Sequence, residues 1–264
     1  MAARRPYSGK KLPDKSVGRR VGAARALSKL GLASRTVAAD WVRAGRVSLN
    51  GKLITDPESP VVLERDEIRL DGMPARAMVK RYVMLNKPRG LVTTARDEQG
   101  RATVYSCFPN PQDHGLAPVG RLDKASEGLL LFSNDTEWAS RLLDPVSHLN
   151  KTYHVQLNTR LTGRQLDDLH AGLRMDDGTL LKVSQAKLLR AGDKTSWLEI
   201  ILSEGKNRQI RRLLEACDVE VLRLIRIAIG PVVLGELAKG ASRALTMHEV
   251  QALSAASATV SPAK

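Results

Sequence analysis

The sequence has little cysteine, no histidine cluster and no long apolar run. Its 264 residues include two cysteines, Cys107 and Cys217, which lie far apart and form no CxxC pair. This pattern excludes a disulfide framework and a zinc ribbon. None of the five histidines lies at metal-ligand spacing, so we predict no metal site. The longest strongly apolar stretch without a charge lies between Arg226 and Glu236 and has about nine residues, well short of the ~18 of a membrane span.

Two further absences narrow the possible function classes. The basic N-terminus has no apolar segment, so it does not resemble a secretory signal. Neither GxGxxG nor GxxxxGKS occurs, so no nucleotide cofactor is expected. Apolar residues make up 42% of the chain, which is enough for a globular core. We therefore expect a soluble, monomeric protein of a reducing compartment, the cytoplasm, with no cofactor and no membrane contact.

Positive charge is what the sequence has in excess. Lys and Arg number 42 against 28 Asp and Glu, which gives a formal net charge of +14. Half of this excess lies in residues 1–25, where Asp14 is the single acid. Prolines and glycines are interspersed there, so we predict a disordered basic arm over 1–18, and the small, polar residues 254–264 predict a disordered tail. The charge indicates a polyanionic partner, with an arm that only aids solubility as the alternative.

Residues 19–76 predict a small module of two helices and a hairpin. Apolar residues at helical spacing run from Val21 to Leu30, and Ser34 can cap a second helix. The Asn-Gly dipeptide at 50–51 is a strong signal for a tight hairpin. Such an arrangement leaves several cations on the surface, where an ordinary solvated face is the simplest interpretation.

The order of these elements resembles the RNA-binding module named after ribosomal protein S4. The similarity rests on the succession helix, Ser-Arg, helix, Ala-Gly-Arg-Val and Asn-Gly-Lys. The resemblance implies that four of the cations contact RNA phosphates, namely Arg35, Arg43, Arg46 and Lys52.

Residues 78–253 predict a larger domain of the α+β class. Segments typical of strands outnumber those typical of helices, and the two do not alternate regularly, which argues against Rossmann and P-loop folds. We expect strands at 82–85, 91–94, 129–132, 151–157, 197–202 and 219–229, and helices at 138–143 and 207–217.

The candidate catalytic residue is Asp123, which lies on a Gly-bounded turn directly before a buried strand. Its neighbours Arg121 and Lys124 favour the ionised carboxylate. A rigid loop that holds an ionised carboxylate suits a nucleophile or a base. The alternative is an ordinary turn residue. Glu127 suggests a glycosidase-like carboxylate pair, for which a surface glutamate is the simpler interpretation.

Residues 120–135, GRLDKASEGLLLFSND, closely resemble the signature of the RsuA-type pseudouridine synthases, which isomerise uridines in ribosomal RNA. The other landmarks of that family follow in its order: NKPRG at 86–90, KTYHV at 151–155, EGKNRQIRR at 204–212 and LRLIR at 222–226. With the N-terminal module, the resemblance covers residues 20–250. It implies a central mixed, mainly antiparallel sheet with flanking helices and an active-site cleft, plus a small N-terminal α/β RNA-binding module.

The resemblance also implies roles for individual residues. Asp123 is the central carboxylate, and it either attacks the anomeric carbon of the ribose or removes the proton from ribose carbon two. Tyr153 stacks on the uracil and assists removal of the carbon-five proton. Arg211 pairs with the aspartate and keeps it ionised in a dry cleft. The other implied substrate-binding residues are Arg121, which holds the flipped nucleotide, Leu224, which lies beneath the tyrosine, Lys87, Arg208 and Arg212.

The implied reaction is an isomerisation without a cofactor, because no atom is gained or lost and no redox step occurs. The implied partner is ribosomal RNA or a pre-ribosomal particle. The NRQIRR form favours large-subunit RNA, with small-subunit RNA as the alternative. A catalytically silent ribosome-assembly factor is a rival function, which the intact Asp123, Tyr153 and Arg211 disfavour. A nucleoside hydrolase is another, disfavoured because no second acid matches.

Overall fold

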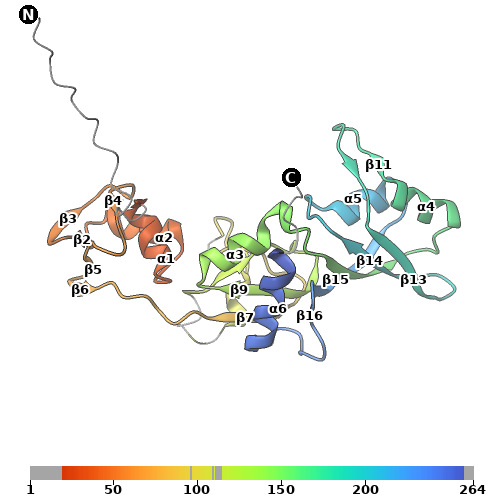
Figure 1. The fold of residues 1–264 in the computed structure, drawn as a ribbon. Helices are drawn as coiled ribbons and strands as arrows, with labels where there is room; N and C mark the ends of the chain where they lie inside the picture. Colours follow the sequence, from red (N-terminus) through yellow and green to blue (C-terminus); the bar gives the residue numbers. More distant parts are fainter. Residues whose placement is uncertain (1–19, 96, 109, 111–114, 259–264) are drawn as a thin grey trace, which may run out of the picture. The chain divides into compact units, whose positions relative to one another are not determined.

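The computed structural model describes residues 20–95, 97–108, 110 and 115–258. The chain divides into two compact units, residues 1–77 and 78–264 (Figure 1). Each unit has a hydrophobic core of its own. The basic arm predicted over 1–18 lies outside the described residues.

Two helices and a small antiparallel sheet share the core of unit 1. The helices are α1 (Ala23–Lys29) and α2 (Arg35–Arg43). The strands are β2 (Val47–Leu49), β3 (Lys52–Ile54), β5 (Ile68–Leu70) and β6 (Met73–Pro74), in the order β3-β2-β5-β6. A separate pair joins β1 (Val21–Gly22) to β4 (Pro60–Val61).

The local signals in the sequence of unit 1 account for these elements. The Ser34 hydroxyl accepts a hydrogen bond from the Val37 amide at 3.3 Å, which caps α2. Asn50 and Gly51 both adopt positive φ, 50° and 79°, as a two-residue hairpin turn requires. The predicted helices and the predicted hairpin are therefore confirmed.

A nine-stranded sheet forms the centre of unit 2. Its main path has the order β13-β14-β10-β15-β9-β7-β17, β16 pairs with β15, and β8 pairs with β9. The strands are β7 (Tyr82–Lys87), β8 (Ala117–Val119), β9 (Glu127–Ser133), β10 (Lys151–Leu157), β13 (Gln185–Ala191), β14 (Ser196–Leu202), β15 (Val221–Ile229), β16 (Val232–Val233) and β17 (Ser242–Ala244). Only β15 and β9 pair in parallel among these described strands. The predicted mixed, mainly antiparallel sheet is confirmed.

Helices cover the sheet of unit 2 in two groups (Figure 1). Side chains of α4 (Gly163–Ala171) and α5 (Gln209–Glu215) belong to the larger hydrophobic cluster, whereas those of α3 (Thr136–Leu143) and α6 (Met247–Ala258) belong to a second one. The short elements are the 3-10 turns η1 (Val104–Cys107) and η3 (Pro145–Ser147) and the pair β11 (Leu173–Arg174) and β12 (Leu180–Leu181).

Strand β9 lies between these two clusters. Leu130 and Phe132 pack into the larger cluster, and Leu129 and Leu131 pack into the other. Because successive side chains of a strand point to opposite faces, a strand covered on both faces has a continuous apolar run. The run at 129–132 therefore forms the buried strand that the sequence predicts.

Two predictions about local structure are wrong. Residues 91–94 are not a strand but form one isolated bridge, in which the Val92 amide donates to Ala102 O and Val92 O accepts from the Val104 amide, both at 3.0 Å. The tail predicted from 254 is helical as far as Ala258, since Leu253 is buried and the Ser254 hydroxyl donates to Val250 O at 2.8 Å. Residues 259–264 lie outside the described part of the chain.

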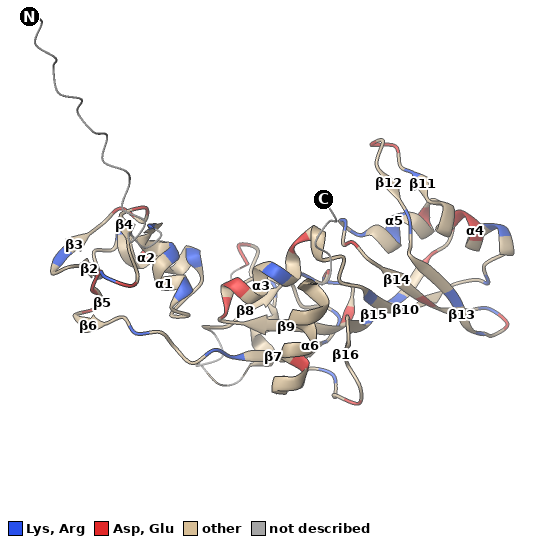
Figure 2. Ribbon diagram, viewed as in Figure 1, with Lys and Arg blue, Asp and Glu red and all other residues tan. Residues whose placement is uncertain are grey.

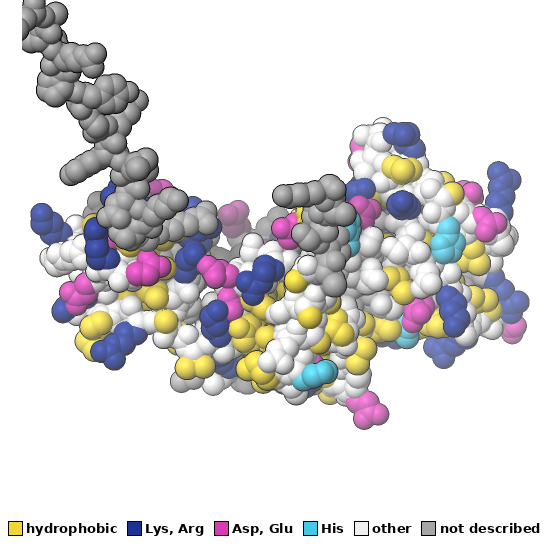
Figure 3. Space-filling model, in the orientation of Figure 1, with side chains coloured by type: hydrophobic (Ala, Val, Ile, Leu, Met, Phe, Trp, Pro, Cys, Tyr) yellow, Lys and Arg dark blue, Asp and Glu magenta, His cyan; other side chains and the backbone are white. Residues whose placement is uncertain are grey.

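Charged side chains are distributed over both units. Figure 2 shows basic residues on α1 and α2 of unit 1 and on α5 of unit 2. On the face drawn in Figure 3, basic and acidic side chains are interspersed within each unit. Among the described residues, every helix is too short or too polar to span a bilayer.

Candidate active site

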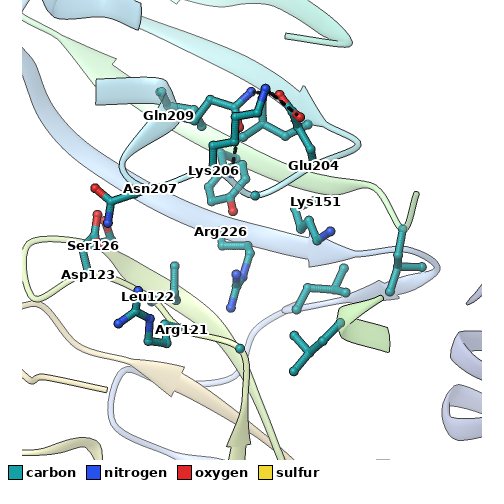
Figure 4. Close-up of a pocket in the computed structure, with 18 of the residues that line it drawn as sticks. Arg121, Leu122, Asp123, Ser126, Lys151, Glu204, Lys206, Asn207, Gln209 and Arg226 are labelled. Carbon is teal, nitrogen blue, oxygen red and sulfur yellow. Dashed lines mark hydrogen bonds and ion pairs between the residues drawn. The ribbon is translucent and has the colours of Figure 1, made fainter. Parts of the chain in front are cut away.

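A pocket of about 590 Å³ lies at the centre of unit 2 (Figure 4). Its walls are the loop between β8 and β9, the strands β10 and β15, and the segment that leads from β14 into α5. Of the predicted site residues, five line this pocket: Arg121, Asp123, Tyr153, Arg208 and Leu224. The fold thus brings together residues that lie about a hundred positions apart in the chain.

The loop that carries Asp123 is fixed by hydrogen bonds to its backbone. The Thr93 hydroxyl donates to Leu122 O at 2.7 Å and accepts from the Leu122 amide at 3.3 Å. On the other side of the aspartate, the Gly90 amide donates to Lys124 O at 2.7 Å. The half-buried Asp123 side chain is therefore free to face the pocket while its backbone is held in place.

Gly128 follows this loop and has a structural reason to be glycine. Its φ is 101°, and a Cβ atom at this position would collide with the backbone of Arg226. The close approach occurs where β9 and β15 pair in parallel. This contact joins the strand that follows Asp123 to the strand that carries Leu224.

Lys87 lies beneath the Asp123 loop. Its side chain is completely buried, and its ammonium donates to Pro88 O, Asp123 O and Ser126 O at 3.1, 3.1 and 2.9 Å. Burial lowers the pKa of Lys87 to about 8, although the nearby charge of Asp123 acts in the opposite direction. The donors of Lys87 are directed at backbone carbonyls and the residue does not line the pocket, so substrate binding by Lys87 stays a prediction that this geometry does not favour.

Replacing Lys87 with Met is expected to reduce the single-turnover rate of the reaction at Asp123 by about 10- to 100-fold. Three carbonyls lose their donor, so we also expect a loss of about 1–3 kcal/mol in stability and a lower Tm. The dissociation constant for the substrate should not change, because the side chain lies outside the pocket. Lys194→Met, at an exposed lysine, is the control. A weaker affinity with an unchanged rate would show that Lys87 binds substrate after all.

Arg211 reaches the same loop from α5. Its guanidinium donates from Nη1 to Val221 O and from Nη2 to Ala125 O, both at 3.2 Å. Burial and the charge of Arg208 lower the pKa of Arg211, and the carboxylate of Asp123 raises it. Arg211 and Asp123 form no ion pair within 4 Å in the described structure, so the predicted direct pair is replaced by a contact through the loop backbone.

Tyr153 and Leu224 lie on neighbouring strands of the pocket wall. In the register of β10 and β15, Tyr153 is opposite Arg226, and Val155 is opposite Leu224. Directly opposite residues share a face, so Tyr153 and Leu224 are diagonal neighbours on the pocket face. Both side chains are more than nine-tenths buried. An apolar wall next to an aromatic ring suits a planar base.

The remaining predicted cations of unit 2 differ in position. Arg121 is exposed and lines the pocket, and Arg208 lines it directly before α5. Arg212 does not line the pocket, and its Nη2 lies 2.7 Å from a carboxylate oxygen of Asp177. This predicted substrate contact is therefore engaged within the protein.

Several pocket residues were not assigned a role from the sequence, and among them are three polar side chains within the family motifs. Lys151, Asn207 and Arg226 all line the pocket and are labelled in Figure 4. Each lies within one of the motifs quoted above, at 151–155, 204–212 and 222–226. Lys151 also precedes Tyr153 by two positions, a spacing that places both side chains on one face of a strand. This spacing alone predicts that Lys151 faces the same pocket as Tyr153.

The predicted RNA contacts of unit 1 are exposed, and three of the four are paired with acids. Arg35 lies 3.1 Å from Glu58, Arg43 lies 3.1 Å from Asp40, and Arg46 makes two hydrogen bonds with Asp71. Lys52 is exposed, and no described residue pairs with its ammonium. Exposed ion pairs contribute little stability, so an RNA phosphate can replace the acid at modest cost.

The chain matches known protein families in both units. The profile of the RNA pseudouridylate synthase family matches residues 81–216, and the S4 domain profile matches residues 24–68. The ribosomal large subunit pseudouridine synthase B of Bacillus subtilis (strain 168) is 36% identical over 232 residues, which are 87% of this chain and 93% of the relative. An uncharacterised RNA pseudouridine synthase of Aquifex aeolicus is 36% identical over 228 residues, 86% of this chain and 91% of the relative.

A solved structure has the same fold. A crystal structure of a pseudouridylate synthase superimposes with a TM-score of 0.63 at 30% sequence identity, and the match covers 88% of this chain and 99% of the other. Because these alignments are longer than unit 2, they extend into unit 1.

Proposed function

The chain belongs to the RNA pseudouridylate synthase family, and we propose that it isomerises a specific uridine of large-subunit ribosomal RNA to pseudouridine. The observation that carries this proposal is the fixed Asp123 loop, which holds a carboxylate in one pocket with Tyr153 and Leu224. The names of relatives such as the Bacillus subtilis enzyme support the large-subunit substrate. An intact catalytic set is not expected of a protein that only binds RNA.

The reaction breaks the bond between ribose C1′ and uracil N1, turns the base and joins C1′ to C5. The C5 proton leaves, and N1 carries a proton in the product, so the composition is unchanged. Asp123 acts at the ribose, either by attack on C1′ or by removal of the C2′ proton. Tyr153 stacks on the base and takes part in removal of the C5 proton. Lys87 and Arg211 keep the Asp123 loop in position through backbone carbonyls.

Arg121 and Arg208 contribute cations to this pocket, and they are proposed to hold the target nucleotide out of its stack. Detachment of the base also requires a closed environment, because a free uracil must not escape. Unit 1 is proposed to bind RNA phosphates through Arg35, Arg43, Arg46 and Lys52.

The test is direct mapping of pseudouridine in RNA treated with the purified, full-length protein. Unmodified transcripts of large-subunit and small-subunit ribosomal RNA are incubated with the wild type and with Asp123→Asn, and each uridine is then read chemically. We expect one or a few modified positions in the large-subunit RNA with the wild type alone. No modification of either RNA would contradict the proposed function, and modification of the small-subunit RNA alone would contradict the proposed substrate.

A chain that begins at Met78 is expected to keep the chemistry and to lose part of the RNA affinity. Unit 2 has its own hydrophobic clusters and the whole pocket, whereas the four proposed phosphate contacts lie in unit 1. Loss of about four contacts should flatten the slope of log K against log salt by about 3. Titrations at several salt concentrations measure this slope for the full-length and the shortened protein. Equal slopes would show that unit 1 does not contact RNA phosphates in this complex.

A further inference from the structure

Three cations of the pocket have no role in the proposed chemistry: Lys151, Lys206 and Arg226. Lys206 is paired with Glu204 at 3.2 Å, which leaves Lys151 and Arg226. Lys151 and Tyr153 lie two positions apart on β10, and Arg226 on β15 is opposite Tyr153, so all three side chains share the pocket face. Ile227 is an extra, unpaired residue of β15 at this point, since Thr152 pairs with Ala228 and Tyr153 with Arg226. Such a bulge re-aims the adjacent side chain. Figure 4 shows Lys151 and Arg226 on the same stretch of the pocket wall.

The charge of these two side chains is not balanced by the protein. Arg226 is 6% exposed, and its Nε donates to Leu129 O at 2.8 Å. Its Nη2 is buried and has no hydrogen-bond partner. Lys151 and Arg226 form no ion pair within 4 Å in the part of the chain that the structure describes. Burial lowers the pKa of Lys151, and the positive charge of Arg226 lowers it further.

Three other buried or half-buried cations of unit 2 are compensated, whereas Arg211, which does not line the pocket, donates to two carbonyls and has a buried Nε without a partner. The Lys87 ammonium has three carbonyl acceptors, Arg223 pairs with Glu127, and Arg243 pairs with Glu249. An uncompensated charge away from water is unfavourable unless a bound group provides the opposite charge. At Lys151 and Arg226 the pocket thus has two positive charges with which no acidic side chain of the described residues pairs.

We propose that Lys151 and Arg226 bind a phosphodiester group of the substrate RNA next to the target uridine. The inference rests on the proposed function, because it takes the pocket to hold a uridine of RNA. A nucleotide whose ribose lies at Asp123 brings its own flanking phosphates to the same pocket. The non-bridging oxygens of one phosphate accept hydrogen bonds from both an ammonium and a guanidinium Nη2. The uracil ring is neutral when it binds, so it does not supply the missing charge.

The test separates the phosphate from the base with three small probes: uridine, uridine 5′-monophosphate and uridine 3′-monophosphate. Each probe is titrated against the full-length protein at low salt, and its dissociation constant is measured by calorimetry or NMR. We expect the wild type to bind one of the two monophosphates about tenfold or more tightly than uridine, as one charge-assisted contact implies. Lys151→Met should remove most of this difference and leave the affinity for uridine unchanged. Lys194→Met, an exposed site, is the matched control.

Arg226→Lys is the second variant, because lysine keeps the positive charge but has no fork of donors. A double variant, Lys151→Met with Arg226→Gln, removes both charges. Arg226→Lys should therefore reduce the preference for the monophosphate less than the double variant does. An equal loss of affinity for uridine and both monophosphates in Lys151→Met would place these cations against the base and overturn the proposal. Unchanged affinities for all probes would overturn it as well. Failure of the proposed function is read separately, from the absence of pseudouridine in ribosomal RNA treated with the wild type.

Discussion

Asp123→Asn is expected to abolish pseudouridine formation. Asparagine keeps the size and polarity of the side chain but removes the negative charge on which both candidate roles depend. The loop itself should not move, because Lys87, Thr93 and Gly90 hold it through backbone atoms. Single-turnover assays with a ribosomal RNA fragment should detect no product. The affinity for RNA should be equal or slightly higher, because the substitution removes a negative charge from a pocket that is rich in cations.

The control for this variant is a second carboxylate in the same pocket. Asp144 lines the pocket, and its carboxylate accepts a hydrogen bond from the Val146 amide at 3.0 Å at the start of η3. In Asp144→Asn the amide oxygen can still accept that bond, so activity should be retained. If Asp123→Asn kept more than about a hundredth of the wild-type rate, a barrier change of only ~2.7 kcal/mol, its assignment as the catalytic carboxylate would be wrong.

The sequence predicted the fold best where burial produces a clear periodicity. The alternation in 151–157 gave the bounds of β10, and the apolar run at 129–132 gave a strand covered on both faces. Strand β13 was missed because it is an edge strand whose side chains are mostly exposed. Its position depends on pairing with β14, a tertiary contact that leaves no apolar pattern in the strand itself.

Helix α6 was missed for a related reason. It is rich in alanine and serine, and its buried residues, Val250 and Leu253, are too few to give a clear amphipathic pattern. Its packing with α3 in a shared cluster fixes it as a helix. Composition alone predicted a disordered tail over the last turns of this helix.

In the candidate site, the sequence motifs predicted which residues share the pocket but not which atoms the other side chains contact. The motifs placed Asp123, Tyr153 and Leu224 in one pocket, and the structure brings these three together. The contacts of Lys87 and Arg211 were not predicted, because both side chains bond to backbone carbonyls. Every residue has a carbonyl, so no sequence pattern indicates which of them a lysine or an arginine will meet. Contacts of that kind follow only from the folded chain.

Tyr153→Phe is expected to bind RNA with the affinity of the wild type and to form pseudouridine at a much lower rate or not at all. The phenylalanine ring keeps the packing of a side chain that is 8% exposed and stacks on the base as tyrosine does. The loss of the hydroxyl removes the group proposed to assist transfer of the C5 proton, an effect of about 100- to 10,000-fold for general acid–base catalysis. Single-turnover rates and dissociation constants for the same RNA fragment measure the two properties separately.

Tyr153→Leu separates the ring from the hydroxyl. Leucine loses both, so RNA affinity should fall together with the rate, and a measurement of Tm shows whether the cavity left in the core lowers stability as well. Equal single-turnover rates for Tyr153→Phe and the wild type would reduce Tyr153 to a stacking role. The C5 proton would then need another acceptor. Because Asp123 is the other residue with an assigned chemical role in this pocket, it would have to act both at the ribose and at C5. An inactive Tyr153→Phe that binds RNA normally restricts Asp123 to the ribose.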